Sequence, residues 1–433
     1  INGQKLNGFN WAVLVAGAHT WTNYRHQANI YHAYHLIKSH GIPDSNIIVM
    51  HYDDIAHHDS NPTPGVVINQ PNGTNVYEGV PKHYTGDAVS AKNFLSVMKG
   101  DPLLALSGKK VLRSGPLDNV FIYFSDHGGH VAFASDYLYA NDLNDALQYM
   151  YRRKMYSRLV FYMEACYSGS MFDQFLPNNI NVYANTAANT TQSSYSRYYD
   201  SYRKTWLGDS YSSHWMENSE ASNLAEVTLE NQYELVKNIT TTSHVQQYGD
   251  MKESNLPLSL FLGSKQPSSL GAKPTNDLDA VDATDVPIHT LNRTIESTTN
   301  STEREILVEQ LAMYLEAREF LRFHLAKLVD HVKDLLELEA IDDIMDNTRR
   351  VLTRVNIGCY RTVVDTFSDN CFGLTQPKLA KKVAQRLVLY CQQYLSEVSY
   401  GSKGSKQSKG SKGSEGSKGS KVAVGNLCQH YTD

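Results

Sequence analysis

Short, almost continuous apolar runs alternate with helix-like segments over the first 265 residues, and this alternation constrains the fold most strongly. Six apolar runs are present, at 11–16, 47–51, 119–124, 158–163, 180–184 and 258–262. Helical periodicity lies between them, at 26–40, 88–98, 141–155 and 220–237. Strands without polar alternation are typical of a sheet that is buried on both faces. The pattern therefore predicts an α/β domain with a mostly parallel sheet and helices on both faces.

The composition changes after this domain. Ser, Thr, Pro, Asn and Asp dominate 264–301 without periodicity, which predicts a linker. After Thr302 apolar residues recur at helical spacing, and further helices are expected at 347–355, 360–369 and 377–398. We therefore expect three parts: an α/β domain at 1–265, a linker at 266–312 and an all-α domain at 313–433 with a Gly/Ser/Lys insertion at 401–421. The insertion is most simply a solvated loop, and a patch for acidic glycans or a membrane surface is the alternative.

Composition and charge exclude several classes of protein. The 433 residues include 40 Lys and Arg against 45 Asp and Glu, which gives no electrostatic signature for nucleic-acid binding. No apolar run is long enough to span a bilayer. The chain begins at Ile1 without a charged and apolar leader, so we expect any signal peptide to be removed or absent. Few cysteines and several glycosylation sequons favour the secretory route; the sequons are at Asn72, Asn189, Asn238, Asn292 and Asn300.

Two reactive side chains follow neighbouring strands of the expected sheet. The run at 119–124 leads to His127 and Gly128, and the run at 158–163 leads to Glu164 and Cys166. A thiolate nucleophile needs a base nearby and backbone N–H donors for the developing oxyanion. Taken alone, Cys166 is more simply a small buried residue and His127 a core histidine, but their shared position at strand ends favours a cysteine–histidine catalytic pair.

The number of cysteines supports this interpretation. Four of the five cysteines lie in the helical domain, where they can form two disulfides, and Cys166 is left alone in the α/β domain. A lone thiol on the secretory route is either inert and buried or a protected nucleophile, and the position of Cys166 favours the second. No metal-ligand spacing stands near it, so we expect neither a metal nor another cofactor.

The motifs around these residues resemble those of the legumain family of asparaginyl endopeptidases, also called vacuolar processing enzymes. The resemblance covers most of 11–262 and is weaker in the helical domain. It is carried by Asn23–Ala28, Tyr52–Ala56, Asn61–Gly65, Gly79–Lys82, Asp126–Gly128, Glu164–Cys166, Ser193–Tyr195, Leu207–Asp209 and Thr242–Gly249. It implies a caspase-like α/β fold with a death-domain-like helical prodomain, and a lysosomal, vacuolar or other acidic compartment, or secretion.

The resemblance also implies roles for individual residues. Cys166 would be the nucleophile, His127 the proton-transfer group and Asn23 the residue that orients the imidazole. The N–H groups of Gly128 and Cys166 would bind the oxyanion. The substrate pocket would include Arg25, His26, Glu164, Ser193, Ser194 and Asp209. The family cleaves after Asn, and after Asp at lower pH.

One arginine and two carboxylates form a suitable pocket for a side-chain amide, which offers one acceptor and two donors. An ionised substrate Asp would be repelled by Glu164 and Asp209, and its protonation would remove the repulsion. An ordinary buried ion-pair cluster at Arg25, Glu164 and Asp209 is the alternative.

Family prodomains cover the active site and are released by cleavage after Asn in the linker at acidic pH. Asn300 is the expected processing site here and Asn292 the second candidate. Family pairing implies the disulfides Cys359–Cys391 and Cys371–Cys428. Tyr167 stands where relatives usually carry a Glu that helps to latch the prodomain.

The lead hypothesis is therefore a secreted-route zymogen that hydrolyses asparaginyl bonds through a thioester acyl-enzyme. Expected partners are proteins and peptides with exposed Asn, the chain's own prodomain as an intramolecular inhibitor and cystatin-type inhibitors. A transpeptidase using the same acyl-enzyme is the first alternative. A non-catalytic, protease-like binding protein is the second, although Asn23, His127 and Cys166 are all present. A membrane-anchored transamidase is disfavoured.

Overall fold

A computed structural model describes residues 8–128, 137–266, 279–335 and 353–370. The chain divides into two compact units, at 1–304 and 305–433, and each is described by itself. No helix among the described residues is long and apolar enough to cross a membrane.

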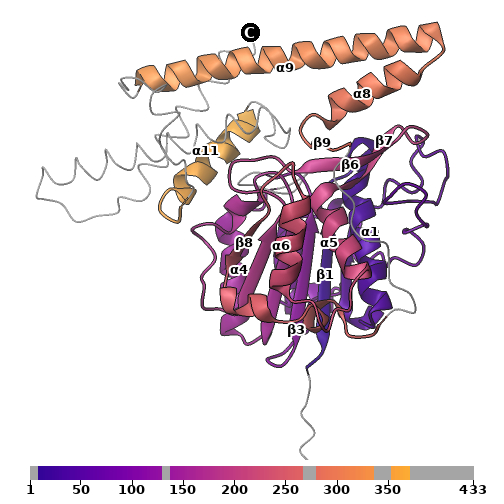
Figure 1. Cartoon of the computed structure of the whole chain (residues 1–433). Coiled ribbons are helices and arrows are strands. Elements are labelled where there is room, and N and C mark those ends of the chain that lie inside the picture. The colour runs from indigo at the N-terminus through magenta and orange to yellow at the C-terminus, as the bar shows by residue number, and fades with distance from the viewer. Residues whose placement is uncertain (1–7, 129–136, 267–278, 336–352, 371–433) are drawn as a thin grey trace, which may run out of the picture. The chain divides into compact units, whose positions relative to one another are not determined.

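The first unit is built on a six-stranded sheet in the order β2-β1-β3-β4-β5-β8 (Figure 1). Its strands are β1 (Asn10–Ala16), β2 (Ile47–Met50), β3 (Asn119–Ser125), β4 (Arg158–Glu164), β5 (Val182–Thr186) and β8 (Gln246–Gly249). The first five pair in parallel and only β8 is antiparallel. Every residue of β2 and β3 is buried. The predicted mostly parallel, doubly covered sheet is confirmed.

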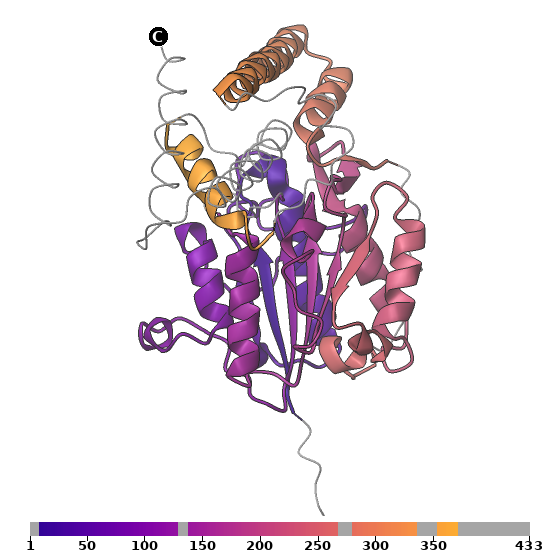
Figure 2. The same ribbon diagram turned by 90° about the vertical axis from the view of Figure 1, so that its left-hand side faces the viewer.

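Helices cover both faces of this sheet (Figures 1 and 2). One layer contains α1 (Tyr24–Ser39), α5 (Ser210–Glu220) and α6 (Leu229–Ile239). In this layer α5 contacts both α1 and α6. The other contains α2 (Ala91–Met98) and α4 (Ala140–Arg152). The short helix α3 (Pro102–Leu106) follows α2. The main apolar core joins the sheet to α1, α5 and α6. This packing fixes the three helices against the sheet.

Two of the predicted elements are wrong. The run 258–262 is the helical turn α7 (Ser259–Leu262), because Leu258, Phe261 and Leu262 bury one helical face after Pro257. Such short apolar runs fit a buried strand and a buried helix equally well in sequence. The predicted helix at 220–237 is also divided: α5 ends at Glu220, and a capping box between Thr228 and Asn231 starts α6.

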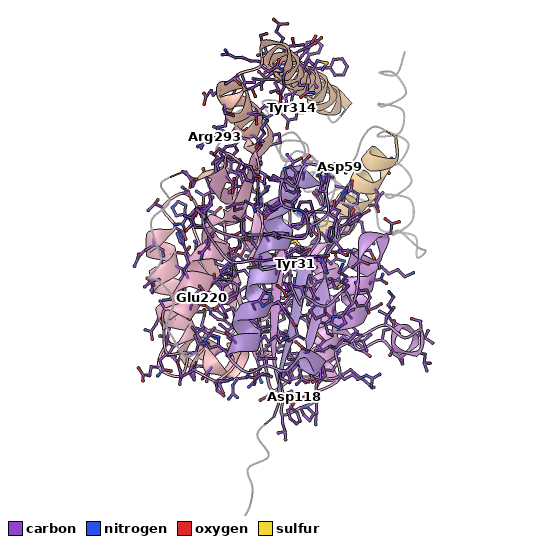
Figure 3. All side chains as sticks on the ribbon, turned by 90° about the vertical axis from the view of Figure 1, so that its right-hand side faces the viewer. Tyr31, Asp59, Asp118, Glu220, Arg293 and Tyr314 are labelled. Atoms are coloured by element: carbon purple, nitrogen blue, oxygen red, sulfur yellow. The ribbon has the colours of Figure 1, made fainter. Side chains whose placement is uncertain are left out.

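The linker is more ordered than its composition predicts. It contains a short strand, β9 (Val281–Asp282), and the helix α8 (Val286–Ser297). β9 joins β6 (Tyr195–Asp200) and β7 (Thr205–Asp209) in a second sheet of order β7-β6-β9. Arg293 of α8, labelled in Figure 3, stacks over the Tyr199 and Trp206 rings. Tertiary contacts with the hairpin thus organise a segment that has no strong propensity of its own.

The second unit contains most of α9 (Ser301–Leu335) and the shorter α11 (Ile357–Asn370). These helices confirm the predicted helical pattern after Thr302 and at 360–369. The predicted helix at 377–398, most of the one at 347–355 and the Gly/Ser/Lys tract lie outside the described residues.

Candidate active site

The carboxyl ends of β3 and β4 bring the two predicted catalytic residues together. Ser125 and Glu164 are register partners on these neighbouring parallel strands. His127 and Cys166 each follow two residues later, and the Asp126 N–H continues the ladder to the Glu164 carbonyl at 3.0 Å. A methyl group on Gly128 would collide with the Cys166 carbonyl oxygen, so only glycine allows the two loops to approach this closely.

The Asn23 side chain contacts the His127 ring. Its Oδ1 lies 2.8 Å from His127 Nε2, and its Nδ2 donates to the His19 carbonyl at 2.9 Å. The carbonyl can only accept, which identifies Nδ2 as the atom facing it and Oδ1 as the atom facing His127. His127 therefore carries its proton on Nε2, and Nδ1 is free to act as a base. Burial, together with the charges of Arg25 and His19, lowers the His127 pKa to about 3.

Cys166 is a free, buried thiol. Its Sγ accepts a hydrogen bond from the Ser194 N–H at 3.4 Å and lies 3.7 Å from Ser194 Oγ. Burial raises the Cys166 pKa to about 11, and the Asp282 charge adds to the shift while Ser194 opposes it. The next residue, Tyr167, has a positive φ of 56°, which is uncommon outside glycine and allows the chain to turn sharply behind the sulfur. The resting thiol and imidazole are thus both neutral.

A buried ion pair lies beside the catalytic residues. Arg25 Nε donates to Asp209 Oδ1 at 2.8 Å. Asp209 also accepts hydrogen bonds from Asn29 at 2.7 Å and from Ser196 at 3.3 Å. Burial raises the pKa of Asp209, and the Arg25 charge and the hydrogen bonds from Asn29, Arg25 and Ser196 oppose this shift. This set of donors therefore favours the ionised form that pairs with Arg25, because a buried charge without partners costs several kcal/mol.

Glu164 and His26 complete the predicted pocket, and burial shifts the pKa of each toward its uncharged form. Glu164 Oε2 accepts from the Ser212 N–H at 3.1 Å and from its hydroxyl at 2.7 Å. Burial and the nearby Asp209 charge raise the Glu164 pKa well above its ordinary value. Burial, Arg25 and His127 lower the His26 pKa, so the 3.7 Å approach of His26 Nδ1 to Asp209 is a contact and not an ion pair. The predicted repulsion of an ionised ligand therefore comes mainly from Asp209.

Three buried polar atoms of this pocket have no hydrogen-bond partner among the described residues. They are Arg25 Nη2, His26 Nε2 and Glu164 Oε1. Buried polar groups are almost always satisfied, and such exceptions call for an explanation. A side-chain amide offers an acceptor for such a guanidinium donor and donors for such a carboxyl oxygen.

Comparison with known proteins agrees with this geometry. The sequence pattern of the peptidase C13 family matches residues 10–264. The chain is 46% identical to human (Homo sapiens) legumain over 383 residues, which is 87% of both chains. It is 41% identical to a hemoglobinase of Schistosoma mansoni, covering 88% of this chain and 87% of the relative. It is 38% identical to the vacuolar-processing enzyme delta-isozyme of Arabidopsis thaliana, covering 85% and 84%.

The chain belongs to the peptidase C13 family. It is a legumain-like hydrolase and a cysteine endopeptidase.

The linker of this C13 peptidase passes directly beside the thiol. Val281 and Asp282 pair antiparallel with β6, and the Ala283 N–H donates to the Ser194 carbonyl at 3.0 Å. Ala283 forms a small buried cluster with Cys166 and Tyr167. The residue whose N–H contacts the sulfur therefore also holds the linker through its carbonyl.

Several residues that contact the predicted site were missed by sequence reasoning. The Ser193 hydroxyl lies 3.2 Å from the Tyr167 hydroxyl, and its expected contact with substrate stays a prediction. Asn29, Ser196 and Ser212 were not predicted, although they supply most of the hydrogen bonds to the two pocket carboxyls. Asn29 had a usable signal, because it follows Arg25 by four residues and shares its helical face.

The remaining predicted positions are structural or lie on the surface. Cys359 is disulfide-bonded, whereas Cys371, Cys391 and Cys428 lie outside the described residues, so the predicted pairing stays a prediction. Asn72, Asn238, Asn292 and Asn300 are exposed and Asn189 is partly exposed. Glycosylation at these positions also stays a prediction.

Proposed function

We propose that this C13 peptidase cleaves peptide bonds after asparagine. The three unpartnered atoms of the pocket carry the proposal. Arg25 Nη2 can donate to the substrate amide oxygen, while Glu164 Oε1 can accept from its NH₂. A substrate side chain that lacks the amide would leave these groups unsatisfied, a penalty that gives strong discrimination.

The catalytic steps follow from the two neutral groups. The Cys166 thiol gives its proton to His127 Nδ1, and the thiolate attacks the carbonyl carbon next to the bound Asn. The N–H groups of Gly128 and Cys166 stabilise the oxyanion. The imidazolium then protonates the leaving amine, and a thioester remains on Cys166. Water, deprotonated by His127, hydrolyses the thioester and releases the thiol. An incoming amine would make the same enzyme a transpeptidase.

The linker supports a zymogen mechanism. The strand at 281–282 occupies an edge where an extended substrate could pair, and it buries Cys166 behind Ala283. We place activation at Asn300, because it is exposed and precedes α9, whereas Asn292 lies inside α8. Inhibition by the prodomain, sensitivity to cystatin-type inhibitors and an acidic lysosomal or vacuolar location belong to the same proposal.

The pocket also accounts for cleavage after Asp at lower pH. The raised pKa of Glu164 keeps this carboxyl protonated in acid, where it donates a hydrogen bond to a substrate carboxyl and adds no negative charge. As the pH rises, ionisation of the substrate carboxyl beside Asp209 becomes unfavourable, so cleavage after Asp is lost before cleavage after Asn.

The experiment is a comparison of matched peptides. The full chain is incubated at about pH 4–5 and assayed on fluorogenic Ala-Ala-Asn, Ala-Ala-Gln and Ala-Ala-Asp peptides, with and without an added amine. We expect Ala-Ala-Asn to be preferred, and sequencing of the released helical fragment to begin at Ser301. Cys166→Ala is the inactive control. Equal cleavage of the Asn and Gln peptides would refute the proposed specificity.

A further inference from the structure

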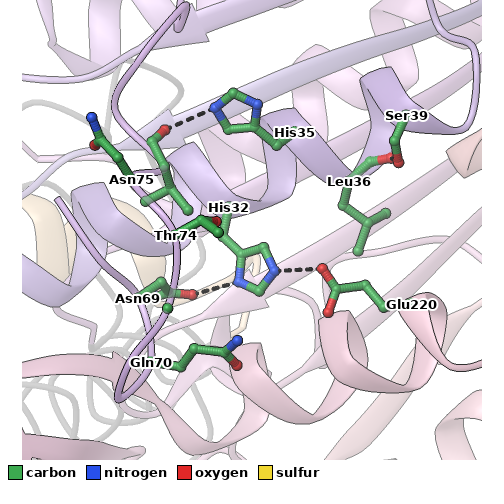
Figure 4. A pocket seen from close by; sticks show the side chains of 11 residues that line it. His32, His35, Leu36, Ser39, Asn69, Gln70, Thr74, Asn75 and Glu220 are labelled. Carbon is green, nitrogen blue, oxygen red and sulfur yellow. Dashed lines mark hydrogen bonds and ion pairs between the residues drawn. The ribbon is translucent and has the colours of Figure 1, made fainter. Parts of the chain in front are cut away.

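A polar cavity lies on the surface of the catalytic unit, separate from Cys166 and His127 (Figure 4). It has a volume of about 320 Å³ and is lined by α1, the loop after β2 and the end of α5. His32 and Glu220 meet at its wall, with Nε2 2.7 Å from Oε1. Glu220 is 32% exposed, and Figure 3 shows it at the outer side of the unit. The cavity therefore exposes this ion pair to the pH of the surrounding solution.

Geometry shows that His32 carries two protons. Its Nδ1 lies 2.8 Å from Asn69 Oδ1. The orientation of the Asn69 amide is fixed, because its Nδ2 donates to the Leu207 carbonyl at 2.8 Å. Both ring nitrogens of His32 thus face oxygen acceptors and both must donate. Burial lowers the His32 pKa, but the hydrogen bond and charge of Glu220 outweigh this effect and raise it.

A chain of hydrogen bonds continues from His32 to the specificity pocket. Asn69 Nδ2 donates to Asn29 Oδ1 at 2.9 Å, and Asn29 Nδ2 donates to Asp209 Oδ2 at 2.7 Å. Every donor in the chain points from His32 toward Asp209, so each bond polarises the next in the same sense. The chain ends on the carboxylate that holds Arg25.

We propose that Asn69 and Asn29 are positioning residues that transmit the charge state of the His32–Glu220 pair to Asp209. Loss of a proton from His32 leaves a lone pair facing either Asn69 or Glu220. Asn69 cannot rotate to compensate, because the Leu207 carbonyl holds its amide. The disturbance therefore falls on the next bond: the Asn69 donor that fixes Asn29 Oδ1 weakens, and Asn29 Nδ2 is held less firmly against Asp209. The substrate side chain binds more weakly, while the catalytic pair is untouched.

The groups acting on His32 come from two helices. Glu220 and Glu217 act from α5. On α1, His35 senses the His32 charge together with that of Lys38. His40 acts on Glu220. The remaining polar neighbours of His32 are uncharged. They are the Asn69 side chain and, beyond it, the Leu207 carbonyl. The raised pKa of His32 means that the proton is held in acid and lost as pH rises, so the pocket is best formed at acidic pH.

This inference rests on the proposed function, and its test uses the acid-activated full chain. The KM and kcat for Ala-Ala-Asn are measured from pH 4 to 7.5. In the wild-type chain KM rises with pH while kcat follows a separate profile. His32→Gln and Asn69→Ser have a KM about 5–10-fold higher in acid and almost independent of pH, since either change breaks the chain. Glu220→Gln keeps an acceptor but removes the charge, and moves the KM transition about one unit lower.

His35→Gln is the matched control, because His35 lines the same cavity but its Nε2 bonds the Val76 carbonyl and makes no bond within the chain from His32 to Asp209. Its KM profile should match that of the wild-type chain. Parallel KM profiles of His32→Gln and the wild-type chain would overturn the inference, as would an unchanged transition in Glu220→Gln. If the wild-type chain does not cleave Ala-Ala-Asn at all, the proposed function fails and this inference with it. If the wild-type chain cleaves Ala-Ala-Asn but the variants keep its KM profile, the inference is refuted and the proposed function is not.

Discussion

The proposed catalytic pair and the proposed specificity pocket lie side by side but differ in their electrostatics. Cys166 and His127 are both held neutral, with the thiol pKa raised to about 11 and the imidazole pKa lowered to about 3. The pocket instead keeps a buried Arg25–Asp209 ion pair supported by Asn29 and Ser196. The Arg25–Asp209 pair is thus charged in advance, whereas the proposed reacting groups acquire charge only during the reaction. Four substitutions test this difference.

The largest effect is expected at the thiol. Cys166→Ala removes the atom that forms the thioester, so kcat/KM should fall by about 10⁴-fold or more. The folded structure should be retained, because alanine fits where a small buried thiol stood. Kinetics and circular dichroism measure the two properties separately. Ser193→Ala, which removes a hydroxyl that contacts Tyr167, is the control and should retain most activity. Substantial residual activity in Cys166→Ala would show that another group is the nucleophile.

The ion pair should give the next largest effect. Asp209→Asn leaves Arg25 buried without its counter-charge, which costs about 3–5 kcal/mol of unfolding free energy. Activity on Ala-Ala-Asn should fall by about 10²-fold or more, mainly through KM. Chemical denaturation and steady-state kinetics test both effects. Lys38 and Asp44 form an exposed pair at 3.0 Å, so Asp44→Asn is the matched control and should cost less than about 1 kcal/mol. Equal losses of unfolding free energy in Asp209→Asn and Asp44→Asn would mean that burial does not increase the contribution of the Arg25–Asp209 pair to stability.

Glu164→Gln should change stability in a pH-dependent way. The raised pKa of Glu164 means that the folded protein holds this proton more tightly than the unfolded chain. Stability contributed by the protonated carboxyl is complete in acid and declines as the pH rises above the ordinary glutamate range. Glutamine mimics the protonated form, so its Tm should match the wild-type Tm near pH 4 and exceed it near pH 7, by about 2–4 °C for each kcal/mol. A constant Tm difference would contradict the raised pKa.

The smallest effect is expected in the linker. Asp282 contributes to the raised pKa of Cys166, and Asp282→Asn should lower that pKa modestly. Alkylation of the uncleaved chain by iodoacetamide at pH 8 should then become a few-fold faster, because only the thiolate reacts. Asp279→Asn tests for general effects, since Asp279 binds backbone N–H groups of β6 instead. An unchanged rate would place the control of Cys166 in burial alone.

The sequence predicted the parts of this site that depend on local patterns. Cys166 and His127 follow buried strands, and parallel strands place such residues at one edge. The run 258–262 was assigned wrongly because so short an apolar run fits either periodicity. The chain from His32 to Asp209 was not predictable, since its amides connect α1 to residues 37 to 180 positions away. Nor was β9, whose two residues become a strand only against β6.

The helix start at Asn300 gives the proposed activation a direction. Asn300 Oδ1 accepts from the N–H groups of Thr302 and Glu303, so this side chain caps α9. An enzyme that binds the amide of Asn300 must first pull it away from the helix. Cleavage would then leave a positively charged amine on Ser301 at the end of α9 where positive charge is least favourable. The two new ends would have little tendency to rejoin. The cleavage would therefore be effectively irreversible, even for an enzyme whose thioester can react with amines.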